Sequence, residues 1–174
     1  MKIIVGPIRT NCYILKSGNE LAVVDPGEET LLILDKIKDM RGILKYIINT
    51  HYHFDHTTAN QEIKKATGAK ILIHEKEKGY IDFPADIFLQ DNEEIILGEE
   101  KILVRNFPGH SEGSICLFVE KIIFTGDLLF KDGYGRTDLV GGSEEDMFKS
   151  LDEIRKFLKP GVMVYPGHGD EFQI

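Results

Sequence analysis

Short apolar runs of strand-like composition alternate along the chain with segments of helical periodicity. Near the N-terminus, the runs Cys12–Lys16 and Leu21–Asp25 are separated by a Ser-Gly-Asn sequence, which is typical of a β-hairpin turn. The segment Glu28–Met40 follows with apolar residues at helical spacing and acidic residues in its first turn. We therefore expect a hairpin followed by a helix.

The rest of the chain continues this alternation. A helix is expected over Thr57–Thr67, ending at Gly68. Ser143 is the expected N-cap of another helix, which runs from Glu144 to about Leu158. Further strands are expected at Leu44–Asn49, Lys70–Ile73, Glu94–Ile96, Lys101–Phe107, Ser114–Val119, Lys121–Phe124 and Gly161–Tyr165. This order predicts an α/β protein of two similar halves.

Length and composition narrow the class of protein. The 174 residues suffice for one hydrophobic core, so we expect a single domain over residues 1–174. A net charge of −8 argues against a nucleic-acid partner. No apolar run approaches the roughly 18 residues that span a bilayer, and none resembles a signal peptide. The expected location is the cytoplasm, and Cys12 and Cys116, both in apolar runs, are expected to pack in the core.

Histidines and aspartates cluster at predicted strand ends. Seven of them have side chains that bind borderline divalent cations: His51, His53, Asp55, His56, His110, Asp127 and His168. Seven ligands are too many for one tetrahedral ion and suit two metals that share a carboxylate. Loops at the ends of strands in α/β proteins converge on one edge, so these residues are expected to meet there.

The spacing of the ligands divides them between two ions. Residues two apart in an extended segment point the same way, whereas Asp55 and His56 follow where the chain turns into a helix. The first set is expected to be His51, His53 and His110. The second set is expected to be Asp55, His56 and His168. Asp127, after a strand and a glycine, is the expected bridging carboxylate.

Two neighbouring metal ions make hydrolysis possible. Ions about 3.5–4 Å apart can lower the pKa of a bound water from about 15.7 towards about 7, which supplies a hydroxide to attack a carbonyl carbon. Asp55 and Asp127 are the side chains expected to act with that hydroxide. Zinc is the expected metal, although the same ligands suit iron and manganese. The sequence therefore predicts a binuclear metallohydrolase.

The remaining histidine is not assigned to the metal site. His74 ends an apolar run, and a lone histidine beside a strand is more often a hydrogen-bonded core residue than a ligand. We therefore expect a structural role for it.

The ligand motifs resemble those of the metallo-β-lactamase-fold superfamily. The matching segments, in order, are Thr50–His56, Pro108–Ser111, Thr125–Asp127 and Pro166–Gly169. The resemblance implies a four-layer αβ/βα sandwich, two sheets flanked by helices, with the metals at one edge. Val24–Gly27 is similar to an early strand-end motif of that family, whose aspartate (Asp25 here) supports the site without being a ligand.

Within the superfamily, the segment Gly135–Leu139 followed by Gly141–Ser143 is similar to the glyoxalase II-like hydroxyacylglutathione hydrolases. This implies hydrolysis of a small-molecule S-acyl thioester such as S-lactoylglutathione. The resemblance places Asp127 on both ions. An aspartate there, rather than a cysteine, distinguishes the chain from the common zinc β-lactamases.

The residues expected to bind the substrate match that family only in part. Arg136 falls at the basic position that contacts glutathione, but Asp138 stands where an aromatic residue is expected. Tyr134 is the alternative aromatic wall, with packing within its loop as the competing interpretation. The sequence stops at Ile174 without the C-terminal helical extension of glyoxalase II, which leaves open a homo-oligomer in which a second copy replaces it.

Other functions of the same fold stay open. An iron-dependent persulfide dioxygenase also has a Gly-Arg-Thr-Asp loop, and its single iron would here be bound by His51, His110 and Asp127. A non-enzymatic metal-binding module is disfavoured by the complete ligand set. An RNA-processing nuclease is disfavoured by the acidic composition.

Overall fold

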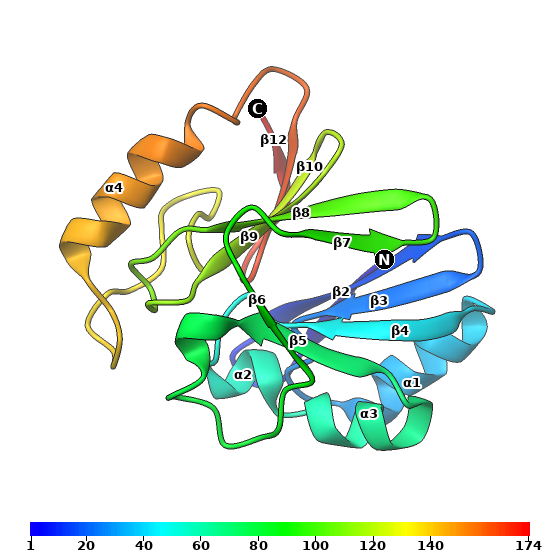
Figure 1. Cartoon of the computed structure of the whole chain (residues 1–174). Coiled ribbons are helices and arrows are strands. Elements are labelled where there is room, and N and C mark those ends of the chain that lie inside the picture. The colour runs from blue at the N-terminus through cyan, green and yellow to red at the C-terminus, as the bar shows by residue number, and fades with distance from the viewer.

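Two six-stranded sheets face each other in the computed structural model, which describes residues 1–174 (Figure 1). The first sheet contains, in spatial order, β1 (Lys2–Val5), β2 (Thr10–Ser17), β3 (Glu20–Val24), β4 (Ile43–Ile48), β5 (Lys70–His74) and β6 (Ile87–Leu89). The second contains, in spatial order, β12 (Phe172–Gln173), β11 (Met163–Pro166), β10 (Ile122–Gly126), β9 (Ile115–Val119), β8 (Glu100–Asn106) and β7 (Glu94–Leu97).

Helices cover the outer faces of both sheets. The helical elements are α1 (Thr30–Asp39), α2 (Phe54–Thr57), α3 (Asn60–Thr67), the 3₁₀ turn η1 (Glu75–Glu77) and α4 (Glu144–Ile154). Helices α1 and α3 pack on the first sheet, and α4 packs on the second (Figure 1). None of these helices is long and apolar enough to cross a membrane.

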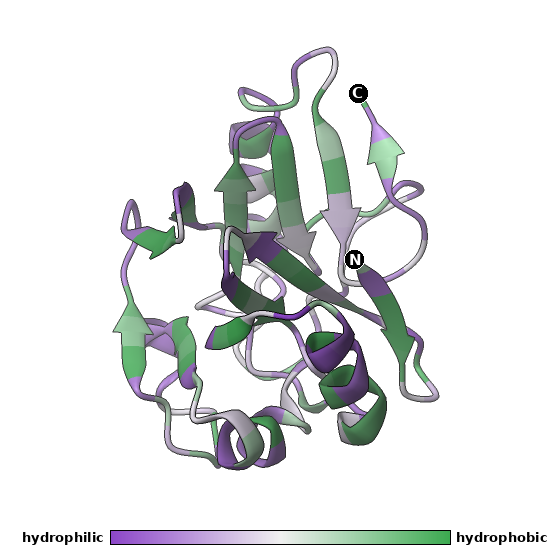
Figure 2. Ribbon diagram, turned by 90° about the vertical axis from the view of Figure 1, so that its right-hand side faces the viewer, coloured by the Kyte–Doolittle hydropathy of each residue, from purple (hydrophilic) through white to green (hydrophobic).

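Three separate apolar cores hold the layers together. Alternate residues of a strand face opposite sides of its sheet, so apolar strands supply two cores at once, as the green strands of Figure 2 indicate. In β3, Leu21 and Val23 pack towards α1 and α3, whereas Ala22 and Val24 pack between the sheets. A third core lies between the second sheet and α4. This arrangement confirms the predicted four-layer αβ/βα sandwich.

The two cysteines lie in different cores. Cys12 packs between the first sheet and its helices, and Cys116 packs between the second sheet and α4. Both are fully buried, and burial raises the pKa of each thiol above its ordinary value. The predicted core role of both cysteines is confirmed.

The structure corrects the predicted helix boundaries. The expected helix over Thr57–Thr67 begins only at Asn60, as α3, and the short helix α2 precedes it; the two are separate because the amide of Ala59 donates to the carbonyls of Pro26 and Gly27. The acidic residues expected in the first turn of α1 precede it: Glu29 has a left-handed backbone (φ 53°), so the helix begins at Thr30. Helix α4 starts after Ser143, whose hydroxyl accepts from the amide of Asp146, but it ends at Ile154 rather than near Leu158.

Strand direction brings the functional loops to one edge. Strands β3 and β4 are parallel, as are β10 and β11, so each pair ends at the same side of its sheet. Strand β8 runs in the direction of β10 because both are antiparallel to β9. The residues that follow these strands can therefore meet across the two sheets.

Candidate metal centre

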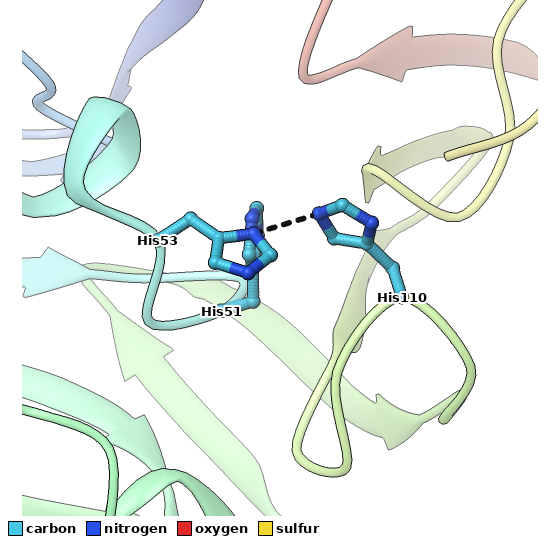
Figure 3. Close-up of side chains that lie close together, drawn as sticks. All are labelled: His51, His53 and His110. Atoms are coloured by element: carbon cyan, nitrogen blue, oxygen red, sulfur yellow. Dashed lines mark hydrogen bonds between the residues drawn. The ribbon is translucent and has the colours of Figure 1, made fainter. Parts of the chain in front are cut away.

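Three histidines form the first of two donor groups. His51 follows β4, His53 is the N-cap of α2, and His110 lies in the loop after β8. The Nδ1 atom of His53 lies 2.8 Å from Nε2 of His110 (Figure 3). The centroid of the His51 ring lies 4.7 Å from the centroids of both of these rings. One ring nitrogen from each histidine lies within 4.8 Å of the other two. The structure thus brings together the residues predicted for the first ion.

The second donor group contains Asp55, His56 and His168. The Nε2 atoms of His56 and His168 lie 3.4 Å apart, and each lies 3.3 Å from Oδ2 of Asp55. Asp55 and His56 belong to α2, and His168 follows β11. These are the residues predicted for the second ion.

Asp127, directly after β10, lies between the two groups. Its Oδ2 atom is 3.4 Å from Nε2 of His110 in the first group and 3.5 Å from Nε2 of His168 in the second. Its Oδ1 atom is 3.5 Å from Nε2 of His56. The carboxylate is therefore placed where a ligand shared by two ions would have to lie.

Hydrogen bonds outside the centre direct the histidine lone pairs inwards. Nδ1 of His110 donates to the carbonyl of Arg136 at 2.6 Å. Nδ1 of His51 lies 3.1 Å from the Thr50 hydroxyl, and Nδ1 of His56 lies 3.0 Å from Oδ2 of Asp25. A proton held on Nδ1 favours the tautomer that a metal ligand needs, in which the lone pair of Nε2 would face a cation bound in the centre.

The charge state of the first group also suits a cation. Burial, followed by repulsion from His56 and His110, lowers the pKa of His51 well below its usual value. Burial and the neighbouring His110 lower the pKa of His53 to about 4. Both imidazoles are therefore neutral at pH 7 and have lone pairs to donate.

The second group is rich in negative charge. Burial opposes charge on His56, but Asp25 and Asp127 outweigh it and raise its pKa well above the usual value. Burial likewise opposes charge on Asp55, but hydrogen bonds with His168 and His56 hold the pKa of Asp55 well below its usual range. The carboxylates require a positive charge among them.

Buried atoms that have no hydrogen-bond partner indicate that a bound cation supplies this positive charge. Nε2 of His51 and Oδ1 of Asp127 are buried and have no hydrogen-bond partner. Buried polar atoms are normally paired, and acceptors that face one another without a proton repel. A cation among them would satisfy all of these atoms, so the residues present fit two divalent ions.

Asp25, predicted to support the site, lies behind it. The residue is buried, and its Oδ1 accepts from the Thr50 amide at 2.8 Å while Oδ2 accepts from the Thr50 hydroxyl at 2.7 Å. The Thr50 hydroxyl connects Asp25 to Nδ1 of His51, and Asp25 itself contacts Nδ1 of His56. One carboxylate therefore orients a histidine of each donor group.

Sequence reasoning did not identify Glu77. This carboxylate is fully buried, and Oε2 accepts from the amide of Tyr52, between two histidines of the first group. Its Oε1 accepts from the Ser111 hydroxyl at 2.7 Å and the Gly113 amide at 2.6 Å, in the loop that carries His110. Glu77 therefore ties together the two loops of the first donor group.

We expect Glu77→Gln to loosen the first donor group. The amide keeps the size of the carboxylate but turns one acceptor into a donor that faces a donor. Leaving a buried group unpaired costs about 1–3 kcal/mol, and second-layer changes weaken metal binding about 10–100-fold. Urea unfolding of the metal-free protein and zinc titration measure these effects. Glu112→Gln is the matched control, because Glu112 is exposed in the same loop; equal behaviour of the two variants would contradict the role of Glu77.

Two residues at the start of β2 also escaped prediction. The Thr10 hydroxyl donates to Oδ2 of Asp55 at 2.7 Å. The amide of Asn11 donates to the carbonyl of Gly167, and its side chain donates to the carbonyls of Pro166 and Gly169. These bonds fix the loop that carries His168. Threonine and asparagine in an apolar strand gave no signal of this role, because their partners are distant in sequence.

Two glycines allow the backbone to approach the centre closely. A Cβ atom at Gly167 would overlap Oδ1 of Asp127, and one at Gly135 would overlap the carbonyl oxygen of Asp127. The turns that carry these glycines are therefore restricted to glycine by the space around Asp127.

His74 lies outside both donor groups. It ends β5, is buried, and its Nδ1 accepts from the amide of Lys76 as the N-cap of η1. We expect His74→Gln to retain the wild-type metal content, with a stability change of about 1 kcal/mol from the altered cap. Elemental analysis after dialysis measures the first and thermal unfolding the second. Loss of one ion would show that His74 is a ligand.

A cleft of about 570 Å³ opens over the donor groups. Arg136 lines it, and its guanidinium binds Asp138 through two hydrogen bonds of 2.6 and 2.8 Å. Tyr134, predicted with Arg136 as a substrate residue, does not line this cleft; its ring packs against Phe148 of α4. The structure thus brings Arg136 but not Tyr134 to the candidate site.

Solved structures share the fold of this chain. A crystal structure of the BLEG-1 B3 metallo-beta-lactamase superposes with a TM-score of 0.92, at 28% identity, over 99% of this chain and 92% of the other. TTHA1623 in a di-iron-bound form has a TM-score of 0.90 at 26% identity, over 99% and 94%. ETHE1 from Myxococcus xanthus has a TM-score of 0.87 at 25% identity, over 98% and 75%.

Sequence relatives lead to the same family. The probable metallo-hydrolase YqgX of Bacillus subtilis (strain 168) is 32% identical over 189 residues, 98% of this chain and 90% of the relative. The probable polyketide biosynthesis zinc-dependent hydrolase PksB of the same organism is 33% identical over 94% of this chain and 78% of the relative. The sequence model of the metallo-beta-lactamase superfamily matches residues 5–168 of this chain, a range that includes both donor groups. The chain belongs to the metallo-beta-lactamase superfamily.

Proposed function

We propose that this protein is a binuclear metallohydrolase that cleaves S-acyl thioesters. The observation that carries the proposal is the position of Asp127 between two complete donor groups beneath an open cleft. A probable metallo-hydrolase and a probable zinc-dependent hydrolase among the relatives support the hydrolytic class. The glyoxalase II-like loop around Arg136 supports the thioester.

The chain's own residues would hold two ions and position the reaction. His51, His53 and His110 would hold the first ion, Asp55, His56 and His168 the second, and Asp127 both. When bound, such a pair supplies an activated water and a Lewis acid for the carbonyl oxygen. Asp55, fixed by the hydroxyl of Thr10, would orient the water. A thiolate leaving group needs no dedicated acid, because its conjugate acid is already weak.

The test measures metal content and hydrolysis on the same preparation. Protein loaded with zinc, iron or manganese is analysed for metal per chain and then assayed with S-lactoylglutathione and simpler thioesters, with the released thiol measured by Ellman's reagent. We expect two ions per chain and thiol release that disappears after chelation. Faster hydrolysis of a β-lactam such as nitrocefin than of any thioester would overturn the proposed substrate class.

A persulfide dioxygenase is the second candidate, favoured by the similarity to ETHE1 and by the segment Gly135–Asp138. That chemistry would use one iron on His51, His110 and Asp127 and would leave open positions for oxygen. Oxygen uptake by the iron-loaded protein with glutathione persulfide, together with no thioesterase activity, would select this function.

A further inference from the structure

Exposed apolar side chains gather around the cleft that contains the donor groups. Ile8 in the β1–β2 turn is 50% exposed, and Phe54 at the start of α2 is 62% exposed. Leu139 and Val140, in the loop between β10 and α4, are 38% and 70% exposed. All four line the same cleft although they come from three distant segments. Exposed apolar groups gathered beside polar ligands are typical of a binding site for an apolar ligand.

Hydrogen bonds and ring contacts hold apolar residues of the cleft close to the metal-ligand groups. The hydroxyl of Tyr52, between His51 and His53, donates to the carbonyl of Val140 at 2.7 Å. The ring of Phe130, which also lines the cleft, packs edge-on against His168, with ring centroids 6.1 Å apart. A group bound to the metals would therefore extend directly onto apolar surface.

The cleft has little fixed charge with which to hold an anionic group. Arg136 is the only lysine or arginine among its lining residues, and the edge of its guanidinium formed by Nε and Nη2 already binds the carboxylate of Asp138. The pair carries no net charge. A carboxylate at the far end of a substrate would therefore meet a cation already paired with Asp138 and would lose its hydration against Ile8 and Val140.

We infer that the site selects thioesters whose acyl group is an uncharged apolar chain. This inference rests on the proposed function and adds its substrate class. The acyl chain would lie on the wall formed by Ile8, Phe54, Leu139 and Val140, with its carbonyl at the donor groups.

The kinetic test uses one small neutral thiol and varies only the acyl group. Thioesters of N-acetylcysteamine with acetyl, butyryl, hexanoyl and adipoyl groups are compared by kcat/KM. Each partly buried methylene contributes about two- to fourfold, so hexanoyl should exceed acetyl by at least about tenfold. The adipoyl ester, of equal chain length with a terminal carboxylate, should fall at least about tenfold below hexanoyl.

A binding test does not depend on turnover. Acetate, hexanoate and adipate are titrated calorimetrically into the metal-loaded protein, with hexanoate expected to bind at least about tenfold more tightly than the other two. Ile8→Thr should reduce the ratio of hexanoate to acetate affinity by at least about threefold. Ile96→Thr is the matched control, because Ile96 is 49% exposed on β7 and lies outside the cleft. Unchanged acetate affinity shows that the metals are retained.

The outcomes separate the two proposals. Hydrolysis of all four thioesters with no preference for the apolar chain would overturn the inference and leave the hydrolase. No hydrolysis, with a hexanoate preference that Ile8→Thr removes, would overturn the thioesterase and leave the apolar site. Equal affinity for the acids, with Ile8→Thr converting a dimer to a monomer in sedimentation, would show that a second copy covers the wall and would overturn the inference.

Discussion

Asp127→Asn is expected to remove metal from both donor groups at once. The substitution keeps the shape of the side chain but removes the charge that lies 3.4 Å from His110 and 3.5 Å from His168. An amide offers one weakly binding oxygen where the carboxylate offers two charged ones. We expect metal content to fall from two ions to below one per chain, and kcat/KM to fall at least about 100-fold. Elemental analysis and the thioester assay give both values.

Thermal unfolding shows whether Asp127→Asn affects only metal binding or also the stability of the metal-free protein. A ligand at 100 times its Kd stabilises a protein by about 2.7 kcal/mol, so metal should raise the Tm of the wild type and not that of Asp127→Asn. Without metal, the two proteins should melt at similar temperatures. Asp132→Asn, an exposed aspartate in the same loop, serves as the control and should retain both ions. Two ions in Asp127→Asn with wild-type affinity would exclude a bridging carboxylate.

The ligand loops were predictable because their signals are local. The histidines and aspartates stand beside turn residues at the ends of apolar runs, and residues two apart share a direction in extended chain. Parallel strands then bring such loops to one edge of a sheet. The seven residues predicted to converge do lie together, whereas Tyr134 packs on α4, because its loop turns it towards Phe148.

The features that escaped prediction depend on partners distant in sequence. Glu77 bonds to residues 25, 34 and 36 positions away, and nothing in its charged neighbourhood distinguishes it from a solvated glutamate. The break between α2 and α3 arises from bonds between Ala59 and the Pro26–Gly27 turn, which compete with the helix. The short strand β12 has only two residues and exists through its pairing with β11. Tertiary contacts therefore determine the role of Glu77, the break between the two helices and the existence of β12.

Asp25→Asn is expected to weaken the second ion more than the first. The new amide can still accept from the Thr50 amide, and the Thr50 hydroxyl can turn to accept from it. At His56, however, an N–H now faces Nδ1 at the position of Oδ2, 3.0 Å away. The favoured tautomer then has its proton on Nε2, which is the atom that faces Asp55 and His168. Zinc titration should show the affinity of the second ion reduced about 10–100-fold.

Thr50→Val supplies the complementary experiment, because it removes the hydroxyl that links Asp25 to His51 and leaves the Asp25 carboxylate beside His56. Valine has the shape of threonine but no hydroxyl to hold Nδ1 of His51, while Asp25 keeps its contact with His56. We therefore expect this variant to weaken the first ion and to spare the second, the reverse of Asp25→Asn. Site occupancy can be followed with cobalt, whose absorption differs between a site of three histidines and one with fewer. Equal effects of the two variants on both ions would mean that Asp25 and Thr50 stabilise the edge of the sheet generally and do not orient individual ligands.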